Sequence, residues 1–588
     1  MFRGLLGLLA CTTVTATILL ASGCVHPLSR DIEQSLRKTL IHNNQTYLTA
    51  VRDAQLVEVH RPPSLVEKDL EKRMDKIDKI SGLGANALET MELGQTLTGS
   101  EQVNLVSMTL EQVIKLAVTN NLNIRLARLA PAIRDTQITQ REAVFDAIYF
   151  ARFDFSKLDT PQPPTLGGFG VFGSVRQDTR TLETGIRKTL GTGGQVTVST
   201  QLTRNYRNPS FFTVSHYFDA DVLVSLEQPL LRNFGRDITR SQILLAENAR
   251  DQSIADLRQS LLTTIGDTEQ IYWDLVAARH ALLIEQRLYR EAQAALKKME
   301  ARRIYDASSV QISGQRAFVA EARFRVLQAR QAVFESSDRL KAFAYAPNLS
   351  LAGDDVIVPI DKMVDEPIRF NVHEAYKTAL QNRPDMQRAL SQINDATILQ
   401  RVADNQRLPV LDLTSSITFN GLSTQTETDT YENLEDGDFI DYLLSLLFEM
   451  PIGNRAGEAA YSQRKIERLG AVINYQRTAQ NAIFEVKQAL RELDTQYESI
   501  GAAREARIAQ ANLVRARRAQ VEFGHELTPA FIDLKIRGEQ NLSTAEIAEV
   551  NAIRSYNVAI ARFHQAVGTL LKRNGIDFDP EMRAGDYR

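Results

Sequence analysis

The spacing of apolar residues divides the chain into long tracts with a heptad period and shorter tracts that alternate. Proline is absent from Arg236 to Ile304 and again from Arg455 to Phe523. At 1.5 Å per residue, each tract would form a helix roughly 100 Å long. Globular helices are seldom that long, so the tracts predict coiled-coil packing, with an ordinary bundle of long helices as the alternative.

The second long tract contains apolar residues at alternating spacings of three and four, which is a heptad seam. Its members are Ile483, Val486, Leu490, Leu493, Tyr497 and Ile500. The first tract has a matching series, which is Ile265, Thr268, Tyr272, Leu275, Arg279 and Leu282. Polar members interrupt this first series, which predicts a looser or wetter seam. A later helix repeats its apolar residues at sevens, in Ile553, Ile560 and Val567.

Between the helical tracts the apolar period changes to two, which indicates β-strands. The alternation is visible in residues 149–156, 194–203 and 410–419, and again in 440–449. In this last run the residues at even-numbered positions are all apolar (the apolar parity), while the residues at odd-numbered positions include Asp441 and Glu449. The apolar parity consists of Ile440, Tyr442, Leu444, Leu446 and Phe448. We expect a strand with one apolar face and one mixed face.

Two pairs of similar segments indicate an internal duplication. MTLEQVIKLAVTNNLNI at 108–124 matches FNVHEAYKTALQNRPDM at 370–386, and FDADVLVSLEQPLL at 218–231 matches residues 440–453. Each copy reads as a helix, strands, a very long helix, a turn and a returning helix. The predicted parts are a first repeat at 108–350, a linker at 351–369, a second repeat at 370–572 and a tail at 573–588.

The N-terminus has the features of a targeting segment. A basic Arg3 precedes the largely apolar run Leu5–Leu20, and small residues then lead to Cys24. The segment resembles a bacterial lipoprotein signal, in which 1–23 is removed and Cys24 carries lipid, including palmitate. A plain signal peptide or a signal anchor is the alternative. Residues 24–107 would then form a periplasmic extension that either wraps the helices or acts as a tether.

Composition and motifs argue against several classes of function. The chain has 588 residues and a formal net charge of −3, which is too nearly neutral to indicate nucleic-acid binding. Its eight histidines are scattered, and neither HExxH nor GxSxG occurs. The GTGG turn at 191–194 joins two strands and lacks the lysine of a phosphate loop. We therefore expect no catalytic residues, no cofactor and no metal site.

The alternating runs have the length that a membrane requires. Each has about 9–11 residues, enough for a tilted strand to cross a bilayer, and no later segment approaches the ~20 apolar residues of a spanning helix. The segment 422–438 is polar and acidic and predicts a loop exposed to water. One chain offers four clear strand regions and at most six, whereas the smallest closed membrane barrel has about eight strands.

Strands in lipid would therefore require several copies to share one barrel, because open sheet edges are unfavourable in hydrocarbon. A soluble periplasmic β-sandwich attached to a coiled coil is the alternative that alternation alone leaves open.

The order MTLEQVIKLAVTNN, strands, EQPLLRNFGR, long helix, turn and returning helix, followed by a second copy, resembles the TolC-like outer-membrane efflux family. The resemblance covers roughly residues 108–572. It implies a mixed α and transmembrane β fold, in which a homotrimer forms a 12-stranded β-barrel from four strands per chain. A long coiled-coil α-helical barrel would continue from it into the periplasm. The sequence does not decide whether strands within 181–204 join the barrel or form an extra hairpin.

The resemblance also implies the function of a passive exit duct in a tripartite efflux pump or a type I secretion system. Such a duct lies in the outer membrane of a Gram-negative-type bacterium and contacts outer-membrane lipid. Its partners are a periplasmic adaptor protein and an inner-membrane transporter, and nucleic acid is not among them. The alternative is a lipid-anchored periplasmic coiled-coil scaffold with a soluble β-domain.

Family likeness also implies roles for particular residues. The apolar parity of 440–449 would face lipid. The helical hairpin turns, which would contact the adaptor, are Asp306, Ala307 and Ser308 in one repeat and Gly524, His525 and Glu526 in the other. Asp533 is the candidate for a pore constriction, although it lies nine residues after Gly524 and Ala530 occupies the nearer place typical of the family. A solvated helix residue is the alternative interpretation of Asp533.

Overall fold

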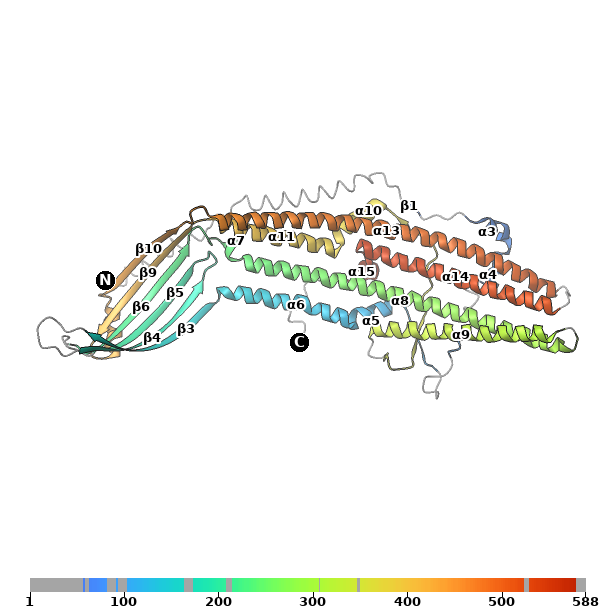
Figure 1. Ribbon diagram of the computed structural model, residues 1–588, viewed down its shortest axis with the longest axis horizontal. Coiled ribbons are helices and arrows are strands. Elements are labelled where there is room, and N and C mark those ends of the chain that lie inside the picture. The colour runs from blue at the N-terminus through green and yellow to red at the C-terminus, as the bar shows by residue number, and fades with distance from the viewer. Residues whose placement is uncertain are drawn as a thin grey trace.

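The computed structural model describes residues 57–58, 63–81, 91–93, 103–162, 173–207, 214–305, 307–345, 349–522 and 528–577. The molecule is elongated, with a β-sheet at one end and long helices that run away from it (Figure 1). This division agrees with the two periods of apolar residues along the sequence.

Within the described residues, the main sheet contains six antiparallel strands in the order β10-β9-β6-β5-β4-β3. The strands are β3 (Ala147–Gln162), β4 (Gly173–Thr189), β5 (Gln195–Arg207), β6 (His216–Pro229), β9 (Val410–Ser423) and β10 (Ile440–Glu449). The expectation of four strands per chain is therefore wrong. The hairpin of β4 and β5, which contains residues 181–204, is inserted into the same sheet between β3 and β6.

The strand predicted at 440–449 is confirmed as β10. Its register places Ile440 opposite Phe419 and Asp441 opposite Thr418 on β9. Since directly paired residues lie on the same side of a sheet, the two parities of β10 point to opposite faces. The alternation read from the sequence is thus a real division of side chains in space.

The turn between β4 and β5 lies against the start of the helical region. The amide of Gly235 donates a hydrogen bond to the carbonyl of Thr192 at 3.1 Å. Gly193 has a φ of 94°, and a Cβ at this residue would collide with the backbone oxygen of Asn233. Glycine is therefore required at this residue, because the turn both adopts left-handed φ and approaches another backbone closely.

Two very long helices leave the sheet, as the absence of proline predicted. The first is α8 (Ser241–Ala301), which follows the short α7 (Arg236–Thr239), and the second is α13 (Arg455–Glu522). The helices α9 (Ser309–Ala344) and α14 (Pro529–Val567) return beside them (Figure 1).

Shorter helices complete the bundle. The helices α5 (Leu110–Asn120) and α6 (Leu122–Glu142) of the first half correspond to α10 (Val372–Asn382) and α11 (Pro384–Asn405) of the second, and α15 (Leu570–Arg573) follows α14. The helices α6 and α11 lead into β3 and β9, and both pack on α8. Outside the main sheet, β2 (Leu105–Met108) pairs with β7 (Val356–Pro359) and β1 (Val57–Glu58) pairs with β8 (Arg369–Phe370).

The predicted heptad positions form the core between these helices. Fully buried members are Ile265, Thr268, Tyr272, Leu275, Leu282, Val486 and Leu493. Whether the first seam is looser or wetter stays a prediction, but two of its polar members have partners within the protein. The hydroxyl of Thr268 donates to the carbonyl of Thr264 at 2.7 Å, and Arg279 donates to the carbonyl of Pro359 at 2.9 Å. These polar side chains therefore have hydrogen-bond partners within the protein.

Part of the N-terminal extension packs on the helices. It contains α3 (Leu65–Leu70) and α4 (Met74–Ser81). The fully buried Ile77 contacts a cluster that includes Ile508 of α13 and Leu542 of α14. Asp78 forms an ion pair with Arg507 at 3.0 Å. Residues 65–81 therefore pack on the helices, and the choice between wrapping and a tether stays a prediction for the extension as a whole.

The segment 422–438, expected to be a loop, contains the helix α12 (Glu427–Asp436). The Thr426 side chain accepts a hydrogen bond from the amide of Asp429 at 3.2 Å and so caps the helix. Acidic residues in the first turn interact favourably with the positive end of the helix dipole, and Gly437 ends the helix with a φ of 69°. A polar, acidic composition is therefore compatible with a short capped helix.

Candidate functional site

The register of the six strands sorts their side chains into two faces of opposite character. One face carries a row of Tyr442, Ile417, Val224, Val198, Ile186 and Tyr149, one residue from each strand. The other carries a row of Asn420, Asp221, Gln201, Glu183 and Arg152. These are called the apolar face and the polar face. The five predicted lipid-facing residues of β10 lie on the apolar face.

On β4 and β5, the exposure of the two faces is the reverse of that in a water-soluble sheet. On the apolar face, Val198 is 46% exposed and Ile186 is 52% exposed. On the polar face, Ser199 is 5% exposed and Thr203 is 7% exposed. Apolar side chains are normally the buried ones, because their removal from water drives folding. A sheet that curls around its polar face would have this distribution, and it suits an apolar medium outside and water inside.

The uncovered part of the apolar face has nearly the height of the apolar band of a membrane. On β9 it extends from Leu411, opposite Phe448, to Phe419, opposite Ile440, and α12 covers Gly421 beyond it. At about 3.4 Å per residue, that length of strand is roughly 27 Å. A tilt of about 40° reduces the height to roughly 21 Å, slightly below the ~25 Å apolar band of membrane barrels.

Some charged side chains of the polar face have local partners. Arg152 forms ion pairs with Asp154 at 2.8 Å and with Glu183 at 3.5 Å. Asn420 donates a hydrogen bond to Asp441 at 2.7 Å. The carboxylate that interrupts the apolar run of β10 is therefore satisfied on the polar side of the sheet.

At the far end of the helices, the turn between α8 and α9 is held in shape by capping. The Ser308 side chain accepts from the amide of Gln311 at 3.2 Å, and the Gln311 side chain accepts from the amide of Ser308 at 3.0 Å. Ala307 is buried in a cluster with Ile312 and Ile536. Two of the predicted turn residues are therefore structural supports of this turn.

Three of the exposed side chains of the same turn are apolar. Ile304 is 89% exposed, Tyr305 is 84% exposed and Val310 is 79% exposed. Such a group of exposed apolar residues on an otherwise polar helix end is typical of a protein interaction site. The predicted residues Asp306, Gly524, His525, Glu526 and Cys24 lie outside the described residues.

Asp533 lies near the start of α14 with its side chain 54% exposed, and it forms an ion pair with Arg537 at 3.1 Å. The two residues are one helical turn apart, so the carboxylate has a partner within its own helix. Its role in a pore constriction stays a prediction.

A buried ionic cluster that sequence patterns did not reveal joins α8, α13 and α14. Glu546 is 3% exposed and binds Arg287 of α8. Glu549 binds Arg504 at 2.7 Å and Arg507 at 2.5 Å, both from α13. Burial raises the pKa of Glu546 to about 7, while Arg287 acts in the opposite direction. The sequence does show acidic residues spaced along one face of α14, but an ordinary solvent-exposed helix face has the same pattern.

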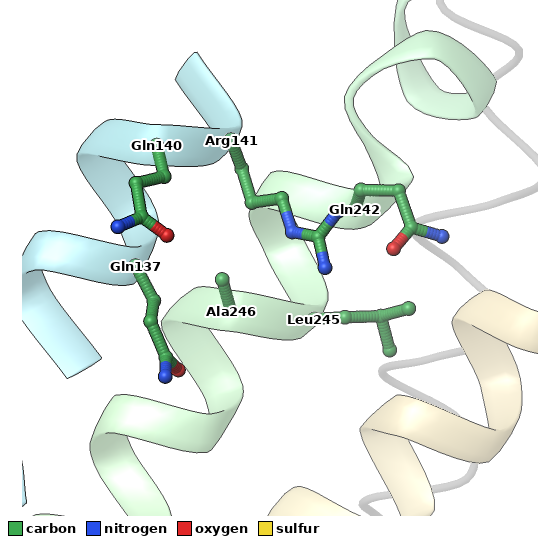
Figure 2. A pocket seen from close by; sticks show the side chains of 6 residues that line it. All are labelled: Gln137, Gln140, Arg141, Gln242, Leu245 and Ala246. Carbon is green, nitrogen blue, oxygen red and sulfur yellow. The ribbon is translucent and has the colours of Figure 1, made fainter. Parts of the chain in front are cut away.

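A hollow of about 520 Å³ lies between α6 and α8. Its walls are Gln137, Gln140 and Arg141 from α6 and Gln242, Leu245 and Ala246 from α8. Figure 2 shows Arg141 extending from α6 towards α8. Small-molecule sites are usually enclosed and mostly apolar, so this open polar hollow does not indicate a substrate pocket. Among the helices of the described ranges, none has the length and apolar character needed to cross a membrane.

Comparisons with known proteins agree with this architecture. Residues 375–569 match the family model described as outer membrane efflux protein. No curated protein gives a sequence match to the chain.

Solved outer-membrane proteins share the fold at low sequence identity. The CmeC outer membrane channel of Campylobacter jejuni is 18% identical, with a TM-score of 0.55 over 84% of this chain and 94% of that chain. The open-state MtrE outer membrane channel of Neisseria gonorrhoeae is 16% identical, with a TM-score of 0.53 over 79% and 90%. VceC of Vibrio cholerae is 13% identical, with a TM-score of 0.53 over 78% and 96%.

Proposed function

We propose that this chain, with its outer membrane efflux protein domain at 375–569, is the outer-membrane exit duct of an efflux or secretion assembly. The observation that carries the proposal is the sheet with exposed apolar residues on one face, such as Val198 and Ile186, and buried polar residues on the other, such as Ser199 and Thr203. Lipid outside and water inside would satisfy both faces at once. The helices would extend the duct through the periplasm, and the chain would conduct its substrate passively without catalysing a reaction.

The duct requires more than one copy of the chain. The strands β3 and β10 are the two edges of the six-stranded sheet, and neither has a second neighbour among the described residues. Unpaired backbone groups cost several kcal/mol each in hydrocarbon, so the two edges favour closure by further copies. Because five antiparallel steps separate β3 from β10, they run in opposite directions. Joining β10 of one copy to β3 of the next would therefore continue the antiparallel order.

A homotrimer, which the family resemblance implies, would then have an 18-stranded wall, since each copy contributes six strands. The diameter of a barrel grows roughly in proportion to its strand number, and walls of about 16–18 strands surround an aqueous channel. The proposed wall is thus wider than the 12 strands expected from family likeness.

The far ends of the helices are the proposed contact with a periplasmic adaptor, which would connect the duct to an inner-membrane transporter. The exposed Ile304, Tyr305 and Val310 support this proposal, because an apolar turn at the end of a hairpin can dock into a partner. Lipid on Cys24 would anchor the same chain to the inner side of the outer membrane. Labelling with a radioactive fatty acid should depend on Cys24, and labelling that persists in Cys24→Ser would contradict this site.

Electrical recording tests the proposed duct directly. The purified protein should run as an SDS-resistant trimer without heating and should give single-channel conductance in planar lipid bilayers. A monomer without conductance would favour the alternative, a lipid-anchored coiled-coil scaffold with a soluble β-domain.

Cryo-electron microscopy of the trimer would count the strands of the wall. Deletion of residues 173–207 removes β4 and β5 and leaves β3 able to pair with β6 in the same antiparallel direction. We expect 18 strands in the full chain and 12 in the deletion variant. A 12-stranded wall in the full chain, with β4 and β5 outside it, would contradict the wider wall.

A further inference from the structure

The apolar face ends, at the edge farthest from the helices, in a row that contains two arginines. The row consists of Phe155, Arg180, Arg204, Phe218 and Ser423. The preceding row contains Phe153, Leu182, Leu202, Ala220 and Gly421. The arginines therefore lie where the apolar surface gives way to polar surface.

Arg180 and Arg204 are directly opposite each other on β4 and β5. Like charges in that arrangement destabilise a sheet. Each guanidinium lies over a phenylalanine ring, Arg180 at 5.7 Å from the centre of Phe155 and Arg204 at 5.6 Å from that of Phe218. Aromatic contacts of this kind hold the guanidinium plane in place but leave its charge uncompensated.

Two acidic residues lie on the same face, in the next rows away from the helices. Asp178 is opposite Lys157, and Asp159 is opposite Arg176. Within the described ranges, neither Arg180 nor Arg204 forms an ion pair with an acidic side chain. Two adjacent positive charges thus remain at the border of the apolar surface, and an anion between them would remove their repulsion.

We propose that Arg180 and Arg204 bind the phosphate of a lipid in the outer leaflet. This proposal rests on the proposed membrane position of the sheet, because the end away from the helices would then lie at the outer headgroups. The planar guanidinium donates paired hydrogen bonds to phosphate oxygens, and two adjacent guanidiniums suit one phosphate better than either alone. The apolar side chains of Phe153, Leu182 and Leu202 in the neighbouring row would contact the acyl chains of the same lipid.

The sheet provides a matched control. Arg187 lies on the same strand as Arg180 but on the polar face, opposite Thr197. Its guanidinium also lies over a ring, at 6.0 Å from the centre of Phe150. A substitution there removes the same charge and the same type of aromatic contact from the other side of the wall.

Native mass spectrometry of the full-length trimer in neutral detergent would measure binding of acylated glucosamine-disaccharide bisphosphate (lipid A) and of the same lipid after removal of its phosphates. We expect the trimer to bind the phosphorylated lipid at least roughly tenfold more tightly, and the Arg180→Gln, Arg204→Gln double variant to lose that preference. Arg187→Gln should keep the preference. Arg204→Lys retains the charge without the guanidinium fork and should give an intermediate affinity. The SDS-resistant trimer band checks that each variant folds.

Retention of the preference by the double variant, or its equal loss in Arg187→Gln, would overturn the proposal. Displacement of the lipid by millimolar inorganic phosphate would overturn the lipid assignment in favour of a free-anion site. Failure of the proposed function has a different signature, in which the chain is a monomer, gives no conductance and binds neither lipid. A conducting trimer without phosphate preference would refute only the lipid site.

Discussion

A lysine in place of Val198 tests whether the apolar face of the sheet contacts lipid. Val198 belongs to the middle row of the apolar face, between Ile186 and Val224. In a membrane, a lysine at this depth should destabilise the folded wall by about 2–4 kcal/mol. In water, the same change at a side chain that is already 46% exposed should alter stability by no more than about 0.5 kcal/mol. The two environments therefore predict clearly different results.

Gln201→Lys is the control on the polar face of the same strand. Gln201 lies directly between Glu183 and Asp221 on the neighbouring strands, so a lysine there gains opposite charges across both pairs. Such cross-strand pairs contribute roughly 0.2–1 kcal/mol each, and we expect this variant to be neutral or slightly more stable.

Urea titration of the protein in phospholipid vesicles gives the comparison, with the folded fraction read from the migration of unheated samples on SDS gels. Val198→Lys should unfold at markedly lower urea concentration than the wild type, whereas Gln201→Lys should not. Equal midpoints for the two variants would refute the assignment of the apolar face to lipid and would favour a soluble β-domain.

Three further changes test other parts of the structure. Burial raises the pKa of Glu546 from 4.5 to about 7, so its contribution to stability is present below pH 4.5 and is lost as the pH rises through about 7. The stability lost over this pH range is at most about 3 kcal/mol, and Glu546→Gln should not show this loss. Melting temperatures of the variant and the wild type that change in parallel from pH 4 to pH 8 would contradict this expectation. The double change Ile304→Ser, Tyr305→Ser should weaken capture of the adaptor without altering the heat stability of the trimer, whereas Leu65→Ser, at another exposed apolar residue, should leave capture intact. A Cβ at Gly421 would collide with the backbone of Thr430, so Gly421→Ala should loosen α12 by about 1–3 kcal/mol and speed its proteolysis, whereas Gly470→Ala in open space should not.

Sequence patterns predicted the elements whose physical signal is strong and regular. The strand at 440–449 was predictable because its apolar parity is uninterrupted, and the long helices were predictable because proline is absent over such lengths. The heptad positions were also predictable, because apolar residues at alternating spacings of three and four form a repeated contact between helices.

Other elements carry weaker signals. The apolar face of β4 includes Arg180, Thr184 and Lys188. The sequence of β4 therefore lacks a visible alternation of apolar and polar residues, although the neighbouring strands show one. The acidic residues of α14 resemble a solvated face, and only the arginines of α8 and α13 show that they are buried. Both cases depend on partners that are distant in sequence. Ala307 and Ser308 lie in the turn between α8 and α9, and their role in docking stays a prediction. The pattern analysis did not identify the exposed Ile304 and Tyr305 beside them.

The turn at Gly193 affects the number of strands in the sheet relative to the number of helices. The β4–β5 hairpin enters the sheet and turns back at its helical end, so it adds two strands without adding a helix. The hydrogen bond from Gly235 to Thr192 fastens this turn to the loop before α7. In the proposed assembly, each copy would have a shoulder, where a broad wall narrows onto a helical tube of unchanged helix number. The diameter of the proposed membrane section could then change by whole hairpins, while the number and packing of the helices stay the same.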